Sequence, residues 1–206
     1  MIAIVDYGRG NLHSVTSALN SVGEDVTIAS TPDDLESASR IVLPGVGAFP
    51  AGMNRLHKSG LVESLEEQVR GKGKPFLGIC LGMQFLATAS LEGTKTQGLG
   101  WIDATVQELP ALKHGLKLPH IGWNETLTDD GSALFAGMGF NPTLYYVHSY
   151  AVTMNSDEGA VAAWCDYGNP FIAALLFDNI AATQFHPEKS QSLGLKFLTN
   201  WAKWTP

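Results

Sequence analysis

The pentapeptide Gly78-Ile79-Cys80-Leu81-Gly82 constrains the fold of this chain more than any other feature of its sequence. It joins an apolar, strand-like run at 75–79 to a helix expected at 83–89. Small residues on both sides of a central residue relieve crowding in a tight strand-to-helix turn and leave that residue exposed at the carboxyl edge of a sheet. At a helix N-terminus, unpaired N–H groups also favour a thiolate. The pattern predicts a nucleophilic Cys80, although a buried cysteine in an ordinary turn would fit these five residues equally well.

Strand-like and helix-like segments alternate through the first half of the chain, which favours a parallel sheet with helices on both faces. We expect strands at 2–5, 25–29, 40–43 and 75–79, and helices at 11–22, 61–71 and 83–89. The second half is strand-rich, with expected strands at 99–106, 144–152, 160–164, 171–177 and 180–185, and it closes with an amphipathic helix at 192–204. We therefore expect an antiparallel or mixed extension of the same sheet. Residues 129–143 are interpreted as a long loop, and 1–206 as one domain, because no linker or repeat divides the chain.

The composition excludes several classes of function. Thirteen basic residues against twenty acidic ones give a net charge of −7, and no basic cluster offers a footprint for nucleic acid. The longest apolar run, 171–177, is too short for a membrane span, and no basic segment precedes the first apolar residues, so we expect neither signal peptide nor anchor. Cys80 and Cys165 lie far apart, without metal-ligand spacing. We expect no metal or cofactor and a reducing, cytoplasmic location.

A second pattern, His186-Pro187-Glu188, follows the apolar run 180–185. Residues two apart on an extended segment project to the same side, so Glu188 can hold the imidazole of His186 in one tautomer while the other ring nitrogen faces a thiol. By itself this string is more often an ordinary turn. Because Cys80 supplies the nucleophile that the pair lacks, the three residues together predict a Cys-His-Glu catalytic triad.

Glycines also stand directly after the expected strand 40–43, in Pro44-Gly45-Val46-Gly47. Glycine lets the backbone turn so that an N–H points into a cleft, as an oxyanion hole requires. A backbone N–H of the Val46-Gly47 peptide and that of Leu81 would then complete a site for acyl transfer. Glycine in a loop is more often only a turn, so this prediction depends on the nearby Cys80.

Gly78-x-Cys80-x-Gly82-x-Gln84, with His186-x-Glu188 far downstream, resembles the triad-type, class I glutamine amidotransferases. Within that family, further blocks resemble the glutaminase subunits of imidazole glycerol phosphate synthases. These blocks are Asp6-Tyr7-Gly8 with Gly10-Asn11, Leu43-Pro44-Gly45-Val46-Gly47-Ala48-Phe49, Pro119-His120-Ile121-Gly122-Trp123-Asn124 and Tyr145-Tyr146-Val147-His148-Ser149-Tyr150. The resemblance implies a single-domain α/β amidotransferase fold, with a mixed, mostly parallel central sheet flanked by helices and an antiparallel extension.

The resemblance also implies a reaction. Cys80 would attack the side-chain amide of glutamine, His186 would carry the proton, Glu188 would orient the imidazole, and water would hydrolyse the cysteine thioester to release glutamate. Residues that the resemblance assigns to contacts with the substrate's α-amino and α-carboxylate groups are Gln84, Ser149, Tyr150 and, in a segment that matches the family only loosely, Glu92.

The ammonia would pass to a separate cyclase subunit, a (β/α)₈ barrel that makes imidazole glycerol phosphate and aminoimidazole carboxamide ribotide in histidine biosynthesis. The resemblance implies that the two subunits form a heterodimer. It places Asn11, Trp123, Asn124 and Tyr145 near the mouth that meets the barrel. Of the remaining histidines, we expect only His120 to reach the interface.

Three alternatives stay open at this point. A glutaminase subunit of an anthranilate-type synthase would share the elbow and triad, although it would lack the Trp123 and Tyr145 blocks. A nucleotide-binding module is suggested by Gly8-x-Gly10, but the third glycine of that fingerprint is replaced by His13. An interaction protein that has lost its chemistry is disfavoured because all three triad residue types are present.

Overall fold

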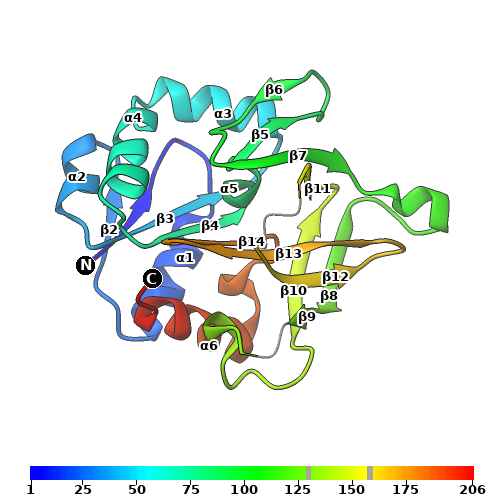
Figure 1. Cartoon of the computed structure of the whole chain (residues 1–206). Coiled ribbons are helices and arrows are strands. Elements are labelled where there is room, and N and C mark those ends of the chain that lie inside the picture. The colour runs from blue at the N-terminus through cyan, green and yellow to red at the C-terminus, as the bar shows by residue number, and fades with distance from the viewer. Residues whose placement is uncertain (129–130, 157–159) are drawn as a thin grey trace.

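An eight-stranded sheet runs through the middle of the molecule (Figure 1), in a computed structural model that describes residues 1–128, 131–156 and 160–206. Its strand order is β2-β1-β3-β4-β14-β13-β12-β9. The parallel part consists of β2 (Val26–Ala29), β1 (Ile2–Val5), β3 (Arg40–Gly45), β4 (Phe76–Cys80) and β14 (Ile180–Thr183). The antiparallel extension consists of β13 (Pro170–Phe177), β12 (Val161–Asp166) and β9 (Leu127–Thr128). The predicted mixed, mostly parallel sheet is confirmed.

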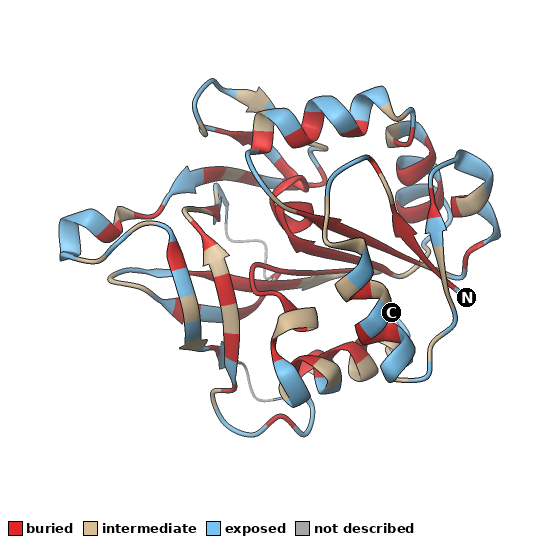
Figure 2. Cartoon of the chain, turned by 180° about the vertical axis from the view of Figure 1, so that it is seen from behind, coloured by how far each residue is buried: buried red, intermediate tan, exposed pale blue. Residues whose placement is uncertain are grey.

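Helices cover both faces of the parallel strands, which explains why the central strands β1 and β4 are apolar and buried at every position. In β1, Ala3 and Val5 pack into one core and Ile2 and Ile4 into another on the opposite face. Figure 2 shows the central strands buried between helices whose outer faces are exposed. The first core is closed by α2 (Pro32–Ser37), α3 (Phe49–Lys58), α4 (Val62–Leu65) and the π-helix η1 (Glu66–Gly71), the second by α1 (Leu12–Ser21) and α6 (Gln191–Lys203).

Two smaller sheets lie beside the large one. One pairs β8 (His120–Glu125) with β10 (Thr143–His148), and the other has the order β11 (Tyr150–Met154), β7 (Ile102–Glu108), β5 (Ala87–Ser90), β6 (Thr96–Gln97). The expected single strand 144–152 is therefore wrong. It breaks at Ser149, whose carbonyl accepts from Leu109 N–H, and its two halves join different sheets. Of the later strands that were expected to extend one sheet, β12, β13 and β14 do so, whereas β7, β10 and β11 lie in the two smaller sheets.

The helix expected at 83–89 is also wrong. The helix α5 covers only Leu81–Gln84, and the following residues form β5, because their backbone groups pair with both β6 and β7. Of the expected loop 129–143, positions 129–130 lie outside the described residues, and the rest contains the 3₁₀ turn η3 (Ala133–Phe135). Two other 3₁₀ turns are η2 (Pro110–His114) and η4 (Pro187–Lys189).

Helix α6 packs against the large sheet through Trp201, which is fully buried in the second core. Its indole N–H donates to the carbonyl of Phe76 on β4 at 3.3 Å. We expect Trp201→Ala to lower the free energy of unfolding by about 3–5 kcal/mol, because it leaves a cavity in the core. Urea unfolding measures this. Trp164, which is 41% exposed on β12, is the matched control, and Trp164→Ala should change stability by far less. Equal effects of the two substitutions would contradict this packing role.

Candidate functional site

Cys80 stands at the turn from β4 into α5 with φ +56° and ψ −106°, a backbone conformation that a residue with a side chain rarely adopts. Such strain costs about 1–3 kcal/mol and persists where the surroundings enforce it. Here they do. A Cβ on Gly78 would lie 2.8 Å from the Gly82 carbonyl oxygen, and one on Gly82 would collide with the carbonyl of Leu43. The glycines of the pentapeptide are required by this close packing.

Helix α5 is only four residues long, which changes the electrostatic argument made from the sequence. A single turn of helix carries only a small part of a full macrodipole, so it contributes little to stabilising a thiolate. Other groups around Cys80 must supply that stabilisation.

His186 and Glu188 follow β14, the neighbour of β4 in the sheet, where Thr183 pairs with Ile79. The carboxyl ends of these two parallel strands bring His186 beside Cys80. His186 Nδ1 donates to Glu188 Oε1 at 2.8 Å, and both side chains are only 2% exposed. Because the carboxylate can only accept, the shared proton lies on Nδ1 and fixes the tautomer of the neutral ring.

The second imidazole nitrogen, Nε2 of His186, has no hydrogen-bond partner in the described part of the chain. Burial alone would lower the pKa of His186, but the adjacent Cys80 and Glu188 favour the imidazolium and raise that pKa overall. The imidazole is thus suited to accept a proton from the thiol and to remain beside the resulting thiolate.

A cavity of about 440 Å³ opens in front of Cys80. Glu188 is not among its lining residues and holds His186 from one side. Residues that the sequence singled out and that line the cavity are Val46, Gly47, Cys80, Leu81, Gln84, Glu92, Ser149, Tyr150 and His186. Lining residues to which the sequence analysis gave no role in the site are Pro119, Val147, His148 and Lys189. Of these four, Lys189 directly follows the His-Pro-Glu string, and this adjacency was the one sequence signal that pointed to it.

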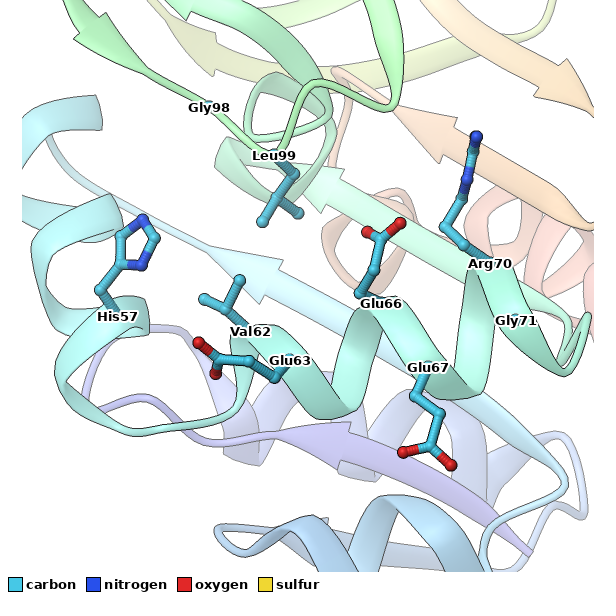
Figure 3. A pocket seen from close by; sticks show the side chains of 9 residues that line it. All are labelled: His57, Val62, Glu63, Glu66, Glu67, Arg70, Gly71, Gly98 and Leu99. Carbon is cyan, nitrogen blue, oxygen red and sulfur yellow. The ribbon is translucent and has the colours of Figure 1, made fainter.

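A larger cavity, of about 800 Å³, lies between α3, the α4–η1 helix and the segment before β7 (Figure 3). Its lining residues include Glu63, Glu66 and Glu67, together with Arg70 and apolar Leu99. The side chain of Glu66 points toward Leu99, and that of Glu67 points away from it (Figure 3). Glu66 is already engaged, because it accepts from the indole N–H of Trp101. The residues that line this cavity include no cysteine and none of the predicted site residues, so the smaller cavity at Cys80 is the candidate site.

The model of the family "Glutamine amidotransferase class-I" matches residues 3–203. The chain belongs to this family. It is 42% identical over 211 residues to "Imidazole glycerol phosphate synthase subunit HisH" of Caulobacter vibrioides, covering 100% of this chain and 99% of that protein. It is 45% identical over 206 residues to the subunit of the same name in Geobacter sulfurreducens, covering 98% of each.

Solved structures support the same fold at lower sequence identity. The amidotransferase superposes on the structure of PurLQS from Thermotoga maritima with a TM-score of 0.72 at 18% identity, covering 98% of this chain and 95% of that one. It also superposes on the glutaminase domain of CTPS from Trypanosoma brucei with bound acivicin. The TM-score is 0.66 at 18% identity, and the match covers 100% of this chain and 94% of that one. The class I amidotransferase fold implied by the sequence motifs is confirmed.

Two of the predicted substrate contacts already have partners in the amidotransferase. Glu92 Oε2 accepts the N–H of Phe49 at 2.7 Å and so caps the start of α3. Gln84 uses its amide nitrogen twice, donating to the carbonyl of Tyr150 at 2.9 Å and to Gln184 Oε1 at 3.0 Å. A donor such as an α-amino group could therefore be met only by the carbonyl oxygen of Gln84.

The residues predicted to meet a partner have different local roles. Trp123 is 46% exposed and packs edge-on against its cross-strand neighbour Tyr145, with the two ring centres 5.7 Å apart. Lys189 lies over the ring of Tyr145. This aromatic face continues into the Cys80 cavity through Lys189. Asn11 caps α1 by accepting from Ser14 N–H, and Asn124 donates to the Asp166 carbonyl at 2.8 Å. Both asparagines thus also stabilise local structure.

The expectation that His120 reaches the interface is wrong, because its side chain is only 3% exposed. It stacks on Tyr167 with the ring centres 4.0 Å apart, and its Nδ1 lies 3.2 Å from His148 Nε2. Burial lowers the pKa of His120 to about 4 and that of His148 to about 3. Both rings are neutral at neutral pH.

Across the described ranges, with their gaps at 129–130 and 157–159, no helix has the length and apolar character needed to cross a bilayer. Within the same ranges, no group of three or more His, Cys, Asp or Glu side chains is arranged to hold a metal ion.

The two neutral histidines make stability depend on pH. Since their pKa values in the folded state lie below the usual 6.5, the unfolded state binds more protons as the pH falls. Their stabilising contribution is complete above about pH 6.5 and is lost toward about pH 4. Removing one buried histidine with His148→Gln should therefore reduce the fall in unfolding free energy between pH 7 and pH 5 by about 1–2 kcal/mol.

Urea unfolding at the two pH values measures this difference. His57 lies on the exposed face of α3, so His57→Gln is the matched control and should keep the wild-type pH dependence. An unchanged pH dependence in His148→Gln would mean that the buried pair does not titrate as its burial requires.

Proposed function

We propose that this chain hydrolyses glutamine to glutamate and ammonia and delivers the ammonia to the cyclase subunit of an imidazole glycerol phosphate synthase, for histidine biosynthesis in the cytoplasm. Cys80 beside the buried His186–Glu188 pair is the single observation that carries the chemistry. Full-length relatives named as subunits of that synthase support the pathway over an anthranilate-type alternative. The glutaminase acts as one domain, residues 1–206.

In the proposed reaction, the Cys80 sulfur forms a bond to the side-chain amide carbon of glutamine while His186 Nε2 takes the thiol proton. The C–N bond then breaks, and the same proton goes to the departing nitrogen, which leaves as ammonia. Water, deprotonated by His186, attacks the thioester and releases glutamate and the thiol. Glu188 keeps the imidazole oriented and stabilises its protonated form.

Backbone N–H groups of Leu81 and of the Val46-Gly47 peptide hold the oxyanion of each tetrahedral intermediate. Gly47 has φ +95°, a conformation that glycine adopts at low cost. Gln84, Glu92, Ser149 and Tyr150 line the same cavity and hold the α-amino and α-carboxylate groups of glutamine.

The partner is a (β/α)₈ cyclase that forms a heterodimer with this chain. We place it on the aromatic face formed by exposed Trp123 and half-buried Tyr145, with Asn11 and Asn124 at its margin. Continuity of this face with the Cys80 cavity through Lys189 supports the placement, since ammonia must leave the cavity toward the barrel.

The deciding experiment is glutamine hydrolysis by the purified chain, alone and with a cyclase subunit and its ribonucleotide substrate. We expect low activity alone and a large increase in the complex. High activity alone, or no response to the cyclase, would keep the glutaminase chemistry and reject this partner.

Cys80→Ala should abolish turnover and leave the fold intact, because alanine fits the turn and removes the nucleophile. Glutaminase activity in the complex, with circular dichroism as a check on folding, measures this. The matched control is Cys165→Ala. Cys165 is buried on β12, where burial raises the pKa of its thiol to about 12, and its loss should leave turnover near wild type. Retained activity in Cys80→Ala would remove the nucleophile assignment.

Glu188→Gln should reduce kcat by about 10- to 1,000-fold, which is less than the loss in Cys80→Ala. The amide can still accept from His186 Nδ1 but cannot stabilise the imidazolium through a negative charge. Steady-state kinetics of the complex measures the ratio. A loss as complete as that of Cys80→Ala would assign Glu188 a larger electrostatic role.

A further inference from the structure

A buried amide contacts the candidate nucleophile from the strand that carries His186. Gln184 directly follows β14, and its side chain is completely buried. Its Nε2 donates to the sulfur of Cys80 at 3.6 Å, within the range of an N–H···S hydrogen bond. The sequence analysis gave Gln184 no role, and the residue is not among those lining the cavity in front of Cys80.

The neighbours of Gln184 determine which end of its amide faces the sulfur. The Tyr150 carbonyl can only accept, so the end of Gln84 directed at it is the amide nitrogen. That same nitrogen contacts Gln184, so the atom of Gln184 facing it is the carbonyl oxygen, at 3.0 Å. The nitrogen of Gln184 is then left to point at Cys80. A flipped Gln184 would bring two amide nitrogens together.

The carbonyl of Tyr150 is itself held in place from a second direction. It also accepts from His148 Nδ1 at 2.9 Å, so the Nε2 of neutral His148 is left to accept from His120 Nδ1 at 3.2 Å. Burial lowers the pKa of His148 to about 3, consistent with a neutral ring in this chain of hydrogen bonds. One connected polar network thus runs from the β8–β10 sheet to the sulfur of Cys80, with every donor and acceptor matched along it.

We propose that Gln184 is a positioning residue of this glutaminase, whose amide N–H holds the Cys80 sulfur and stabilises the thiolate that attacks glutamine. The inference rests on the proposed function. A hydrogen bond from a buried donor favours the charged acceptor over the neutral one. The helix α5 is too short for a strong dipole, and the Gln184 amide adds a hydrogen bond to the Cys80 sulfur alongside the charge interaction of Cys80 with His186.

The test is the rate of Cys80 alkylation by iodoacetamide as a function of pH, followed by mass spectrometry of the peptide that contains Cys80. Gln184→Met keeps the length of the side chain and removes the donor. We expect the midpoint of the rate curve to move upward by about one pH unit, because a lost hydrogen bond to a charged group disfavours the thiolate. The titratable groups around Cys80 are unchanged in this variant; they are His186, the buried Tyr7 and the cavity residues Glu92, His148, Tyr150 and Lys189.

Turnover gives a second readout. In the complex with the cyclase, kcat should fall about tenfold while KM for glutamine stays within about twofold, since Gln184 does not line the cavity. Gln68→Met is the matched control. Gln68 is an equally buried amide on η1, remote from the site, and its variant should keep the wild-type alkylation midpoint and kcat.

Gln184→Glu keeps the size of the side chain and the oxygen that accepts from Gln84. It is the variant to interpret if circular dichroism shows that Gln184→Met does not fold. Its second oxygen faces the sulfur without a donor, so it should move the midpoint upward by more than Met does. A midpoint within about 0.2 pH units of wild type in a folded variant would overturn the proposal, even if turnover fell. The alkylation assay needs neither glutamine nor cyclase, so failure of the proposed function would be recognised separately, by the wild-type turnover assay.

Discussion

Hydrogen bonds on both edges of β4 place the site. On one side β4 pairs in parallel with β3, so that Gly45 lies beside Cys80, and on the other it pairs with β14, so that Thr183 lies beside Ile79. Each of these strands ends at the same edge of the sheet and continues into a segment that lines or supports the cavity. Segments about a hundred residues apart in the sequence therefore meet because parallel pairing aligns their carboxyl ends.

Close packing at that edge explains the local strain. The turn after β4 approaches β3 so tightly that no side chain fits at Gly82, and Gly45 would bring a Cβ within 2.8 Å of Leu81. Cys80 has to adopt a positive φ in the turn between them. Sheet pairing provides the stabilisation that holds this conformation, and the strained backbone exposes the sulfur to the cavity. Stability of the sheet and accessibility of the nucleophile are thus linked through the same few glycines.

Buried polar groups then determine protonation. One ring nitrogen of His186 donates to the Glu188 carboxylate, and the other faces the Cys80 thiol. These two neighbours raise the pKa of His186 despite its burial. His148 and His120 have no such charge partner, so burial lowers their pKa values and they stay neutral. The presence or absence of an acidic neighbour therefore moves the pKa of the same residue type in opposite directions within one region. Because His120 and His148 are neutral, each ring can donate from one nitrogen and accept at the other. His120 therefore donates to His148, and His148 donates to the Tyr150 carbonyl, which also accepts from Gln84.

The sequence by itself determined the elbow, the His-x-Glu pair, the mixed sheet and the family. Those features depend on local sterics, on two-residue spacing and on apolar runs, all of which can be identified from neighbouring residues in the sequence. The short α5, the break at Ser149 and the burial of His120 were decided by tertiary structure, because strand pairing and packing overrode local preference at each position. The contact of Gln184 with Cys80 belongs to the same class. It joins residues 104 positions apart, and only the folded sheet brings that amide to that sulfur.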